Sequence, residues 1–457
     1  MPGRCLSIAW CLAIATAPPA WSAPERPNVL VIFADDQGAV DLNCYGAKDL
    51  STPAIDGLAE RGLRFTQFYS AAPVCSPSRA GLLTGRYPWR VGVANNAGPA
   101  PQENINDLSE STDNPRLAGD AVTMAEVFGA AGYRTAHIGK WHLGHGPASR
   151  PLSQGFGYSF GHLGGCIDNY THFTYWNGPN RHDLWENNTR VRMPGRFFPD
   201  LMVDKATEVI QAESDQPFFM YFASNMPHYP YQGDTKWLDY YAGLPYPRNL
   251  YAAFVSTLDD RVARLLKAID DAGKREDTIV LYQSDNGHSR EMRAHLGGGS
   301  AGPYRGEKFS LFEGGIRLPA VVSWPSQLPR GETRGQVVHA CDWAPTLYEL
   351  CGVAPPAAPI EGKSVAGVLK SADASSPHAA GDLHWDLGKQ WAIRRGPWKL
   401  IYRVSLHDKQ SLSAEDAEWF LSNVELDPSE KQNYASDEPG VVADLRARHE
   451  AMRAATE

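Results

Sequence analysis

Cysteine is scarce in this chain: seven occur among 457 residues, and no two have the C-x-x-C spacing of zinc or dithiol redox motifs. Cys5 and Cys11 lie close to the N-terminus, and the other five are an odd number, so at least one thiol must be unpaired. Cys341 and Cys351 are near enough in sequence to form a disulfide, although spacing alone does not establish the pair. The sequence therefore predicts neither zinc ligation nor dithiol chemistry.

Basic charge is also in short supply. Asp and Glu outnumber Lys and Arg by 52 to 43, and the formal net charge is −9. This balance argues against nucleic acid as a partner. An overall negative field gives an anionic ligand no long-range attraction, so any anion site must be basic locally.

Apolar runs long enough to span a bilayer are missing as well, so no stable membrane insertion is predicted. The N-terminal stretch has the pattern of a signal peptide: Arg4, an apolar core from Leu6 to Ala17, and the small-residue segment APPAWSA. We expect cleavage after Ser22. Residues 1–22 would then be a signal peptide that exports the protein, which makes it periplasmic or secreted.

Four apolar runs have the length and continuity of buried parallel strands: NVLVIFA, YRTAHIG, PFFMYFA and DTIVLYQ. Helical patterns such as YAAFVSTLDDRVARLLKAIDDAG lie between them. We therefore expect an α/β fold whose main domain, residues 23–370, has a large, doubly wound, mostly parallel sheet flanked by helices. Short strands and a terminal helix predict a smaller C-terminal α+β subdomain, with a short antiparallel sheet, over residues 371–457.

Polar residues follow each of these four strands directly. In chain order they are Asp35 and Asp36, Lys140 and His142, His228, and Asp285 and Asn286. Because ligands bind outside the carboxyl ends of the strands in such sheets, we expect these side chains to meet there. Oxygen ligands from Asp and Asn suit calcium or magnesium rather than zinc. Each acidic pair alone also fits a solvated turn.

Two long irregular segments, Asn95 to Asp120 and Gly161 to Arg196, interrupt the alternation of strands and helices. Such insertions are usually functional or disordered, and the second is too aromatic for disorder. Its side chains suit a sugar ring and an anionic group, although a loop packed for its own stability could have the same composition. The candidate substrate-binding residues are His172, Trp176, Arg181 and His182, together with His288 and Arg290 after the second acidic pair.

The segment PVCSPSRAGLLTG, Pro73 to Gly85, places a lone cysteine at the start of a predicted short helix. Ser76 is a good N-cap and Pro77 a good first helical residue, with Arg79 about one turn inside the helix. A helix N-terminus and an arginine both favour negative charge near Cys75. Taken alone, the pattern also fits a buried structural cysteine.

This segment resembles the C-x-P-S-R signature of the type I, formylglycine-dependent sulfatases of the alkaline phosphatase superfamily. Further segments are similar to that family in the same order: NVLVIFADDQG, GYRTAHIGKWHLG, SDNG, EGGIRLPAVVSWP, DWAPTLYEL, AIRRGPWKL and ELDPSEKQNYA. The resemblance covers essentially the whole chain after the leader and points to bacterial carbohydrate and aryl sulfatases. It implies that residues 23–370 are a sulfatase catalytic domain that hydrolyses sulfate monoesters, with a sulfated carbohydrate as substrate.

In that family a formylglycine-generating or other sulfatase-maturing enzyme oxidises the signature cysteine. The resemblance implies 3-oxoalanine (formylglycine) at position 75, hydrated so that one carbon carries two hydroxyls. One hydroxyl would attack sulfur as the alcohol leaves, and the second would then lose its proton and expel sulfate. A single calcium ion is also implied. Its ligands would be Asp35, Asp36, Asp285 and Asn286, with the residue derived from Cys75 completing the shell.

The same family segments imply which side chains balance the charge of the sulfate group. Arg79 would orient the hydrated aldehyde, and Lys140 and Lys308 would contact sulfate oxygens. A histidine must protonate the leaving oxygen. His228 is the first choice for this acid, and His142 would take the proton in the second step, but the two roles could be exchanged.

Two other functions are compatible with the sequence. One is a phosphate or phosphonate ester hydrolase of the same superfamily. The complete CSPSR segment and Asn286 argue against the phosphate ester hydrolases, which commonly use Ser or Thr and two zinc ions, whereas a phosphonate ester hydrolase with formylglycine stays an alternative. The other is a catalytically silent protein that binds sulfated glycans. Every position implied in catalysis is intact, which argues against loss of activity.

Overall fold

The computed structural model of the chain describes residues 26–98, 115–174, 181–406 and 412–455. The predicted leader, residues 1–22, and the candidate substrate-binding residue Trp176 lie outside the described residues. Of the helices within the described ranges, none combines the length and the apolarity that a bilayer crossing requires. The five cysteines in these ranges are free thiols, so Cys341 and Cys351 do not form the disulfide that their spacing allows.

A ten-stranded sheet runs through the main domain in the order β11-β2-β10-β9-β1-β8-β4-β5-β6-β7. Its centre is parallel: β1 (Asn28–Ala34) lies between β8 (Phe218–Ala223) and β9 (Thr278–Ser284), and β4 (Arg134–Lys140) and β5 (Tyr158–His162) continue beyond β8. The outer strands are β2 (Leu63–Phe65), β10 (Ala320–Ser323), β11 (Glu332–Arg334), β6 (Trp185–Glu186) and β7 (Thr189–Arg190). The four apolar runs of the sequence thus form β1, β4, β8 and β9, as predicted.

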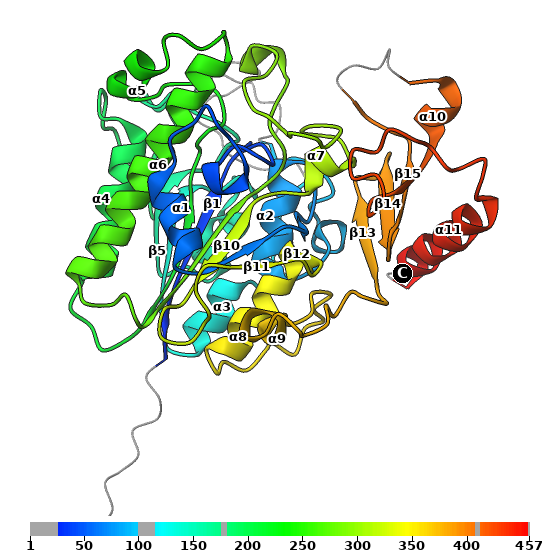
Figure 1. Cartoon of the computed structure of the whole chain (residues 1–457). Coiled ribbons are helices and arrows are strands. Elements are labelled where there is room, and N and C mark those ends of the chain that lie inside the picture. Colours follow the sequence, from blue (N-terminus) through cyan, green and yellow to red (C-terminus); the bar gives the residue numbers. More distant parts are fainter. Residues whose placement is uncertain (1–25, 99–114, 175–180, 407–411, 456–457) are drawn as a thin grey trace, which may run out of the picture.

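Helices cover both faces of this sheet, because both faces of its central strands are apolar (Figure 1). Val29, Val31 and Phe33 of β1 point into one buried cluster, whereas Leu30 and Ile32 point into another on the opposite face. The first cluster includes residues of α2 (Cys75–Thr84), α3 (Met124–Ala130), α8 (Trp343–Leu350) and α9 (Ala366–Lys370). The second includes residues of α1 (Pro53–Glu60), α4 (Phe198–Gln211) and α6 (Arg248–Asp271). The predicted doubly wound α/β fold is therefore confirmed.

A four-stranded antiparallel sheet and a terminal helix form a smaller unit beside the main sheet (Figure 1). Its strands are β13 (Asp382–Asp386), β14 (Trp391–Arg395), β15 (Trp398–Tyr402) and β16 (Trp419–Asn423). Helix α11 (Pro439–Ala454) packs on β14 and β15, as expected for the predicted α+β subdomain. The remaining α-helices and strands of the described ranges are α5 (Thr235–Tyr240), α7 (Glu313–Ile316), α10 (Ala414–Glu418) and the strand pair β3 (Phe68–Tyr69) and β12 (Val338–His339).

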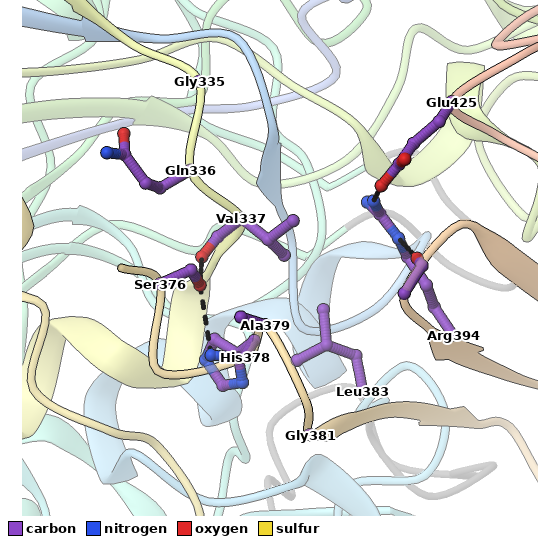
Figure 2. Close-up of a pocket in the computed structure, with 11 residues that line it drawn as sticks. Gly335, Gln336, Val337, Ser376, His378, Ala379, Gly381, Leu383, Arg394 and Glu425 are labelled. Carbon is purple, nitrogen blue, oxygen red and sulfur yellow. Dashed lines mark hydrogen bonds and ion pairs between the residues drawn. The ribbon is translucent and has the colours of Figure 1, made fainter. Parts of the chain in front are cut away.

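A cavity of about 250 Å³ lies where this subdomain meets the main domain (Figure 2). Arg394 of β14 and Glu425 line one side, and Ser376 and His378 line the other. His378 is bound through Nε2 to Asp342 at 2.8 Å. None of the residues predicted for the functional site lines this cavity.

Two glycines allow β4 and its neighbours to come together at their carboxyl ends. Gly139 has φ +115°, and a Cβ there would lie 2.0 Å from the carbonyl oxygen of Ala223 in β8. Gly161 of β5 is equally constrained, since its Cβ would lie 1.8 Å from the carbonyl oxygen of Gly139. The close approach at this edge of the sheet therefore requires glycine.

We predict that Gly139→Ala lowers the free energy of unfolding by about 2 kcal/mol or more, because the methyl group adds a backbone clash to an unfavourable φ. Gly129→Ala in α3 is the matched control, since a Cβ there meets nothing nearer than 3.8 Å and alanine should raise helix stability by up to about 1 kcal/mol. Urea denaturation of both variants measures the difference. Equal stabilities would contradict the assigned packing.

Candidate active site

The strand ends of β1, β8 and β9 are tied together by their own backbones. The N–H of Asp285, after β9, donates to the carbonyl of Ala34 at 3.0 Å, and the N–H of Asp35 donates to the carbonyl of Met226 at 3.0 Å. The N–H of Asp36, which has φ 61°, donates to Oδ1 of Asp285 at 3.0 Å. Residues almost 250 positions apart thus meet at one sheet edge, as their positions after parallel strands predict.

Three carboxylates and three cations face one another in this buried pocket. Lys140 Nζ lies 2.6 Å from Asp35 Oδ2, and Lys308 Nζ lies 2.9 Å from Asp36 Oδ2. Arg79 Nη2 lies 3.0 Å from Asp285 Oδ2 and 3.6 Å from Asp35 Oδ1. The six side chains are at most 2 % exposed. Their formal charges cancel, so an added divalent cation would make the pocket electropositive, as an anion site in an acidic protein requires.

Cys75 is the first residue of α2 and is buried at the edge of this pocket. Its Sγ lies 3.6 Å from Oδ1 of Asp35. The helix begins two residues earlier than predicted. Ser76 does not act as the N-cap, because its hydroxyl accepts the N–H of Ala97 at 2.9 Å, and Val74 takes the extended N-cap position instead. The correction brings the cysteine into the first turn of the helix, and burial raises the pKa of its thiol.

Burial and crowding shift the pKa values of the three carboxyl groups in different directions. Burial opposes ionisation of Asp35, but Lys140, His228 and Arg79 outweigh it and hold the pKa of Asp35 well below its usual range. Burial also raises the pKa of Asp36, which Lys308 offsets only in part. Burial, reinforced by the charge of Asp35, raises the pKa of Asp285 to about 8. A cation among these groups would keep all three ionised.

The hydrogen bonds of Asn286 test whether the pocket suits a bound cation. Its Nδ2 donates to Asp36 Oδ1 at 2.7 Å and to the Gly287 carbonyl at 2.9 Å, whereas its Oδ1 is buried and accepts no hydrogen bond from the described residues. An unsatisfied buried acceptor is costly unless another group binds it. Asp35, Asp36 and Cys75, with His228, also have ligand atoms within 4.8 Å of one another. The donor set therefore fits a hard cation with oxygen ligands.

The two candidate acid–base histidines are buried near the cations. Nδ1 of His228 lies 2.7 Å from the carbonyl of Tyr229, so this nitrogen carries the hydrogen, and Nε2 faces Lys308 Nζ at 3.3 Å. Burial and the charge of Lys308 lower the pKa of His228 to about 3. Burial and Lys140 also lower the pKa of His142, whose ring lies against Gly165. Both rings are thus neutral at neutral pH in this state.

Two further side chains belong to the pocket although the sequence analysis did not single them out. Glu291 lies 3.5 Å from Lys308 Nζ and accepts the hydroxyl of Tyr229 at 3.2 Å. The hydroxyl of Tyr221 lies 3.5 Å from Arg79 Nη1. Tyr221 is hidden within an apolar strand, and Glu291 lies in an irregular loop, so neither position has a sequence pattern that distinguishes it.

The candidate substrate-binding residues differ in burial and do not form a single cluster like that of the catalytic side chains. His172 is fully buried and its Nε2 contacts the carbonyl of Arg196 at 2.9 Å, which is a structural role in this conformation. His182 and His288 are also buried, and burial lowers the pKa of each to about 4. Arg181 is half-buried and Arg290 is exposed. Of this set, the two arginines are the side chains that a ligand can reach most readily.

Comparison with known proteins shows to which family the chain belongs. The family model described as Sulfatase matches residues 27–353, and the model described as N-sulphoglucosamine sulphohydrolase, C-terminal, matches residues 305–455. The chain belongs to the sulfatase family. The first of these ranges contains all the catalytic and metal-ligating residues predicted for the sulfatase site.

Individual relatives agree with this placement. An N-acetylgalactosamine-6-sulfatase of Canis lupus familiaris is 34 % identical over 360 residues, and an N-acetylgalactosamine-6-O-sulfatase of Bacteroides thetaiotaomicron is 29 % identical over 507. These matches cover 73 % and 94 % of this chain; the chain spans 64 % of the first sulfatase and 93 % of the second. The crystal structure titled Ps i-CgsB in complex with k-i-k-neocarrahexaose superposes with a TM-score of 0.80 at 27 % identity, over 93 % of this chain and 92 % of that one.

We predict that Arg79→Met lowers the free energy of unfolding by about 3–5 kcal/mol, because it leaves Asp285 without its buried cationic partner and leaves Asp35 with Lys140 alone. Arg264→Met is the matched control: Arg264 pairs with Asp200 and Asp204 but is 45 % exposed, so its loss should cost less than about 1 kcal/mol. Urea denaturation at neutral pH measures both. Similar losses for the two variants would contradict the charge balance assigned to the pocket.

Proposed function

We propose that this protein hydrolyses sulfate monoesters at the pocket built around Cys75, Arg79, Lys140 and Lys308. One observation carries the proposal: a cysteine at the first turn of α2 lies against carboxylates suited to a cation, with three buried basic side chains beside it. Membership of the sulfatase family supports the same reaction. Position 75, as formylglycine, would supply the geminal-diol nucleophile.

Calcium is the cation that we propose for this pocket. The ligands would be carboxylate oxygens of Asp35, Asp36 and Asp285 and the otherwise unsatisfied Oδ1 of Asn286, with residue 75 alongside. Hard oxygen ligands favour calcium over zinc. When bound, the ion would lower the pKa of the nucleophilic hydroxyl and polarise a sulfate oxygen.

The basic side chains would bind and orient the sulfate group. Lys140 and Lys308 each have an ammonium within 3 Å of a carboxylate, so both are held in place before an anion arrives. Arg79 is fixed by Asp285 and by the Lys140 carbonyl at 3.1 Å. The Lys308 ammonium would pass a proton to Nε2 of His228, which lies 3.3 Å away, and His228 would deliver this proton to the leaving oxygen. In the second step His142 would accept the proton that residue 75 loses.

A sulfated carbohydrate is the substrate class that we propose. The support is that an N-acetylgalactosamine-6-O-sulfatase and a structure in complex with a neocarrahexaose are among the similar proteins. Arg290, which is exposed, and Arg181, which is half-buried, would contact a second anionic group of the sugar together with His288. His172, Trp176 and His182 stay predictions for the same role.

Export and maturation complete the proposal. The signal-peptide pattern of residues 1–22 supports export to the periplasm or the medium. A sulfatase-maturing enzyme would have to oxidise Cys75 before α2 packs, because the folded chain leaves this residue only 1 % exposed. Mass spectrometry of the peptide that contains Cys75, from the native source, tests this step; an unmodified thiol would overturn it.

We expect the Cys75→Ser variant to bind the substrate but to fail in multiple turnover, because a single hydroxyl can attack sulfur but cannot eliminate sulfate afterwards. The measurement compares burst and steady-state release of the alcohol from an aryl sulfate, with matched phosphate and phosphonate esters as controls. Normal steady-state turnover by Cys75→Ser would show that the release step is wrongly assigned. A preference of the wild-type protein for phosphorus esters would favour the alternative hydrolase.

Removal of divalent cations should lower both the melting temperature and the activity. Calcium at about 100 times its dissociation constant should restore roughly 2.7 kcal/mol of stability, whereas magnesium should restore less. Thermal melts of chelator-treated protein measure the effect, with Asn286→Ala as the matched variant that loses one ligand. The calcium site is misassigned if calcium leaves the wild-type melt unchanged, or if Asn286→Ala responds as strongly as the wild type.

A further inference from the structure

Three of the family-like segments contain charged residues that the proposed reaction does not use: Glu313 in EGGIRLP, Lys399 in GPWKL and Glu430 in ELDPSEK. In the structure these residues form one cluster, which we call the Lys399 network. Lys399 Nζ lies 2.7 Å from Glu313 Oε1 and 3.0 Å from Glu430 Oε1. All three side chains are completely buried. Charged residues are rarely buried so fully unless they are paired, as these three are.

The Lys399 network joins the two parts of the molecule. Lys399 lies on β15 and Glu430 follows β16 of the four-stranded sheet, whereas Glu313 begins α7, which precedes β10 of the ten-stranded sheet. Glu430 Oε2 accepts the backbone N–H of Glu313 at 2.6 Å, and its carbonyl accepts Arg305 Nη1 at 3.0 Å. The subdomain therefore holds both ends of one loop, residues 305–313.

This loop carries Lys308 and is bonded to the other active-site loops. The N–H of Lys308 donates to the carbonyl of His288 at 3.0 Å, and the N–H of Phe309 donates to the carbonyl of Pro73, two residues before Cys75, at 2.8 Å. The N–H of Gly287 donates to the carbonyl of Gly315 at 3.0 Å. The loop is thus bonded to the subdomain at its ends and to the neighbouring active-site segments in the middle, and Lys308 lies between these two sets of bonds.

The packing inside the loop leaves no room to absorb a displacement of Glu313. A Cβ on Gly314 would lie 2.3 Å from the carbonyl oxygen of Gly306, and one on Gly315 would lie 2.0 Å from that of Ser310. A Cβ on Gly287 would lie 2.1 Å from the carbonyl oxygen of Gly314. Backbone segments that touch one another move together, because close-packed interiors transmit strain.

We propose that Lys399 and Glu430 are positioning residues for Lys308 and act through Glu313. The C-terminal subdomain is then part of the catalytic machinery. Besides the Lys399 network, its Gln390 Nε2 donates to the carbonyl of Phe309, next to Lys308, at 2.9 Å. The kinetic consequence rests on the proposed sulfatase function. The structural consequence, a loop fixed by the subdomain, does not.

The test uses Glu430→Gln in the full, matured chain. Glutamine keeps the shape and an acceptor for Lys399 and Ser422, but its amide group opposes the N–H of Glu313 with a second donor. We expect faster hydrogen exchange at the amides of Lys308 and Phe309, with exchange in β1 unchanged. Arg446→Met on α11, whose partner Glu450 is also exposed, is the control and should leave both unchanged. Unaltered exchange at Lys308 and Phe309 would overturn the proposal even if the protein proves not to be a sulfatase.

Kinetics separate positioning from general stability. In an active protein, Glu430→Gln should lower kcat for an aryl sulfate by about tenfold to a hundredfold. In a Lys308→Met background the same substitution should change kcat by less than about twofold, because the group it positions is gone. An equal factor in both backgrounds would show that Glu430 only stabilises the fold. Lys399→Met, if it folds, should give the same pattern.

Discussion

The active site depends on keeping Asp35, Asp36 and Asp285 ionised in one buried pocket. Such crowding is unfavourable, and it raises the pKa of Asp285 to about 8 despite its bond to Arg79. Three buried cations compensate the charge, and the unsatisfied oxygen of Asn286 shows where another positive ion fits. The same arrangement explains how a chain of net charge −9 can offer a site to an anion: with a divalent ion, the local charge becomes positive.

The fold supplies this pocket by topology and then fixes it with the second domain. Parallel strands β9, β1, β8 and β4 end at one edge, so side chains from distant parts of the chain converge there. Lys308 is different, because it comes from a loop and not from a strand end. Loops are mobile unless other segments bind them. The Lys399 network and the tightly packed glycines fix the loop of residues 305–313, which carries Lys308. The Lys399 network therefore gives a physical reason why the family-like segments EGGIRLP, GPWKL and ELDPSEK occur together in this chain.

The central strands and the position of the site could be predicted from the sequence, because each is indicated by a short continuous segment of the chain. Continuous apolar runs predicted β1, β4, β8 and β9, and the polar residues directly after them predicted the gathered site. The predicted start of α2 was wrong. The hydroxyl of Ser76 accepts the N–H of Ala97, and the sequence around a helix start does not indicate a partner 21 residues away. The Lys399 network and the contact of Glu291 with Lys308 were invisible for the same reason: they join residues that only the folded chain brings together. His172 is buried with Nε2 against the carbonyl of Arg196, and its role in substrate binding stays a prediction.

The central claim is that widely separated side chains hold one hard cation beside residue 75. A crystal structure of the protein grown with calcium tests it most directly. The account predicts one metal peak bonded to oxygens of Asp35, Asp36, Asp285 and Asn286 at about 2.3–2.6 Å. A pocket without metal in saturating calcium, or a peak ligated by His228 at the distance of about 2.0–2.1 Å typical of zinc, would contradict it.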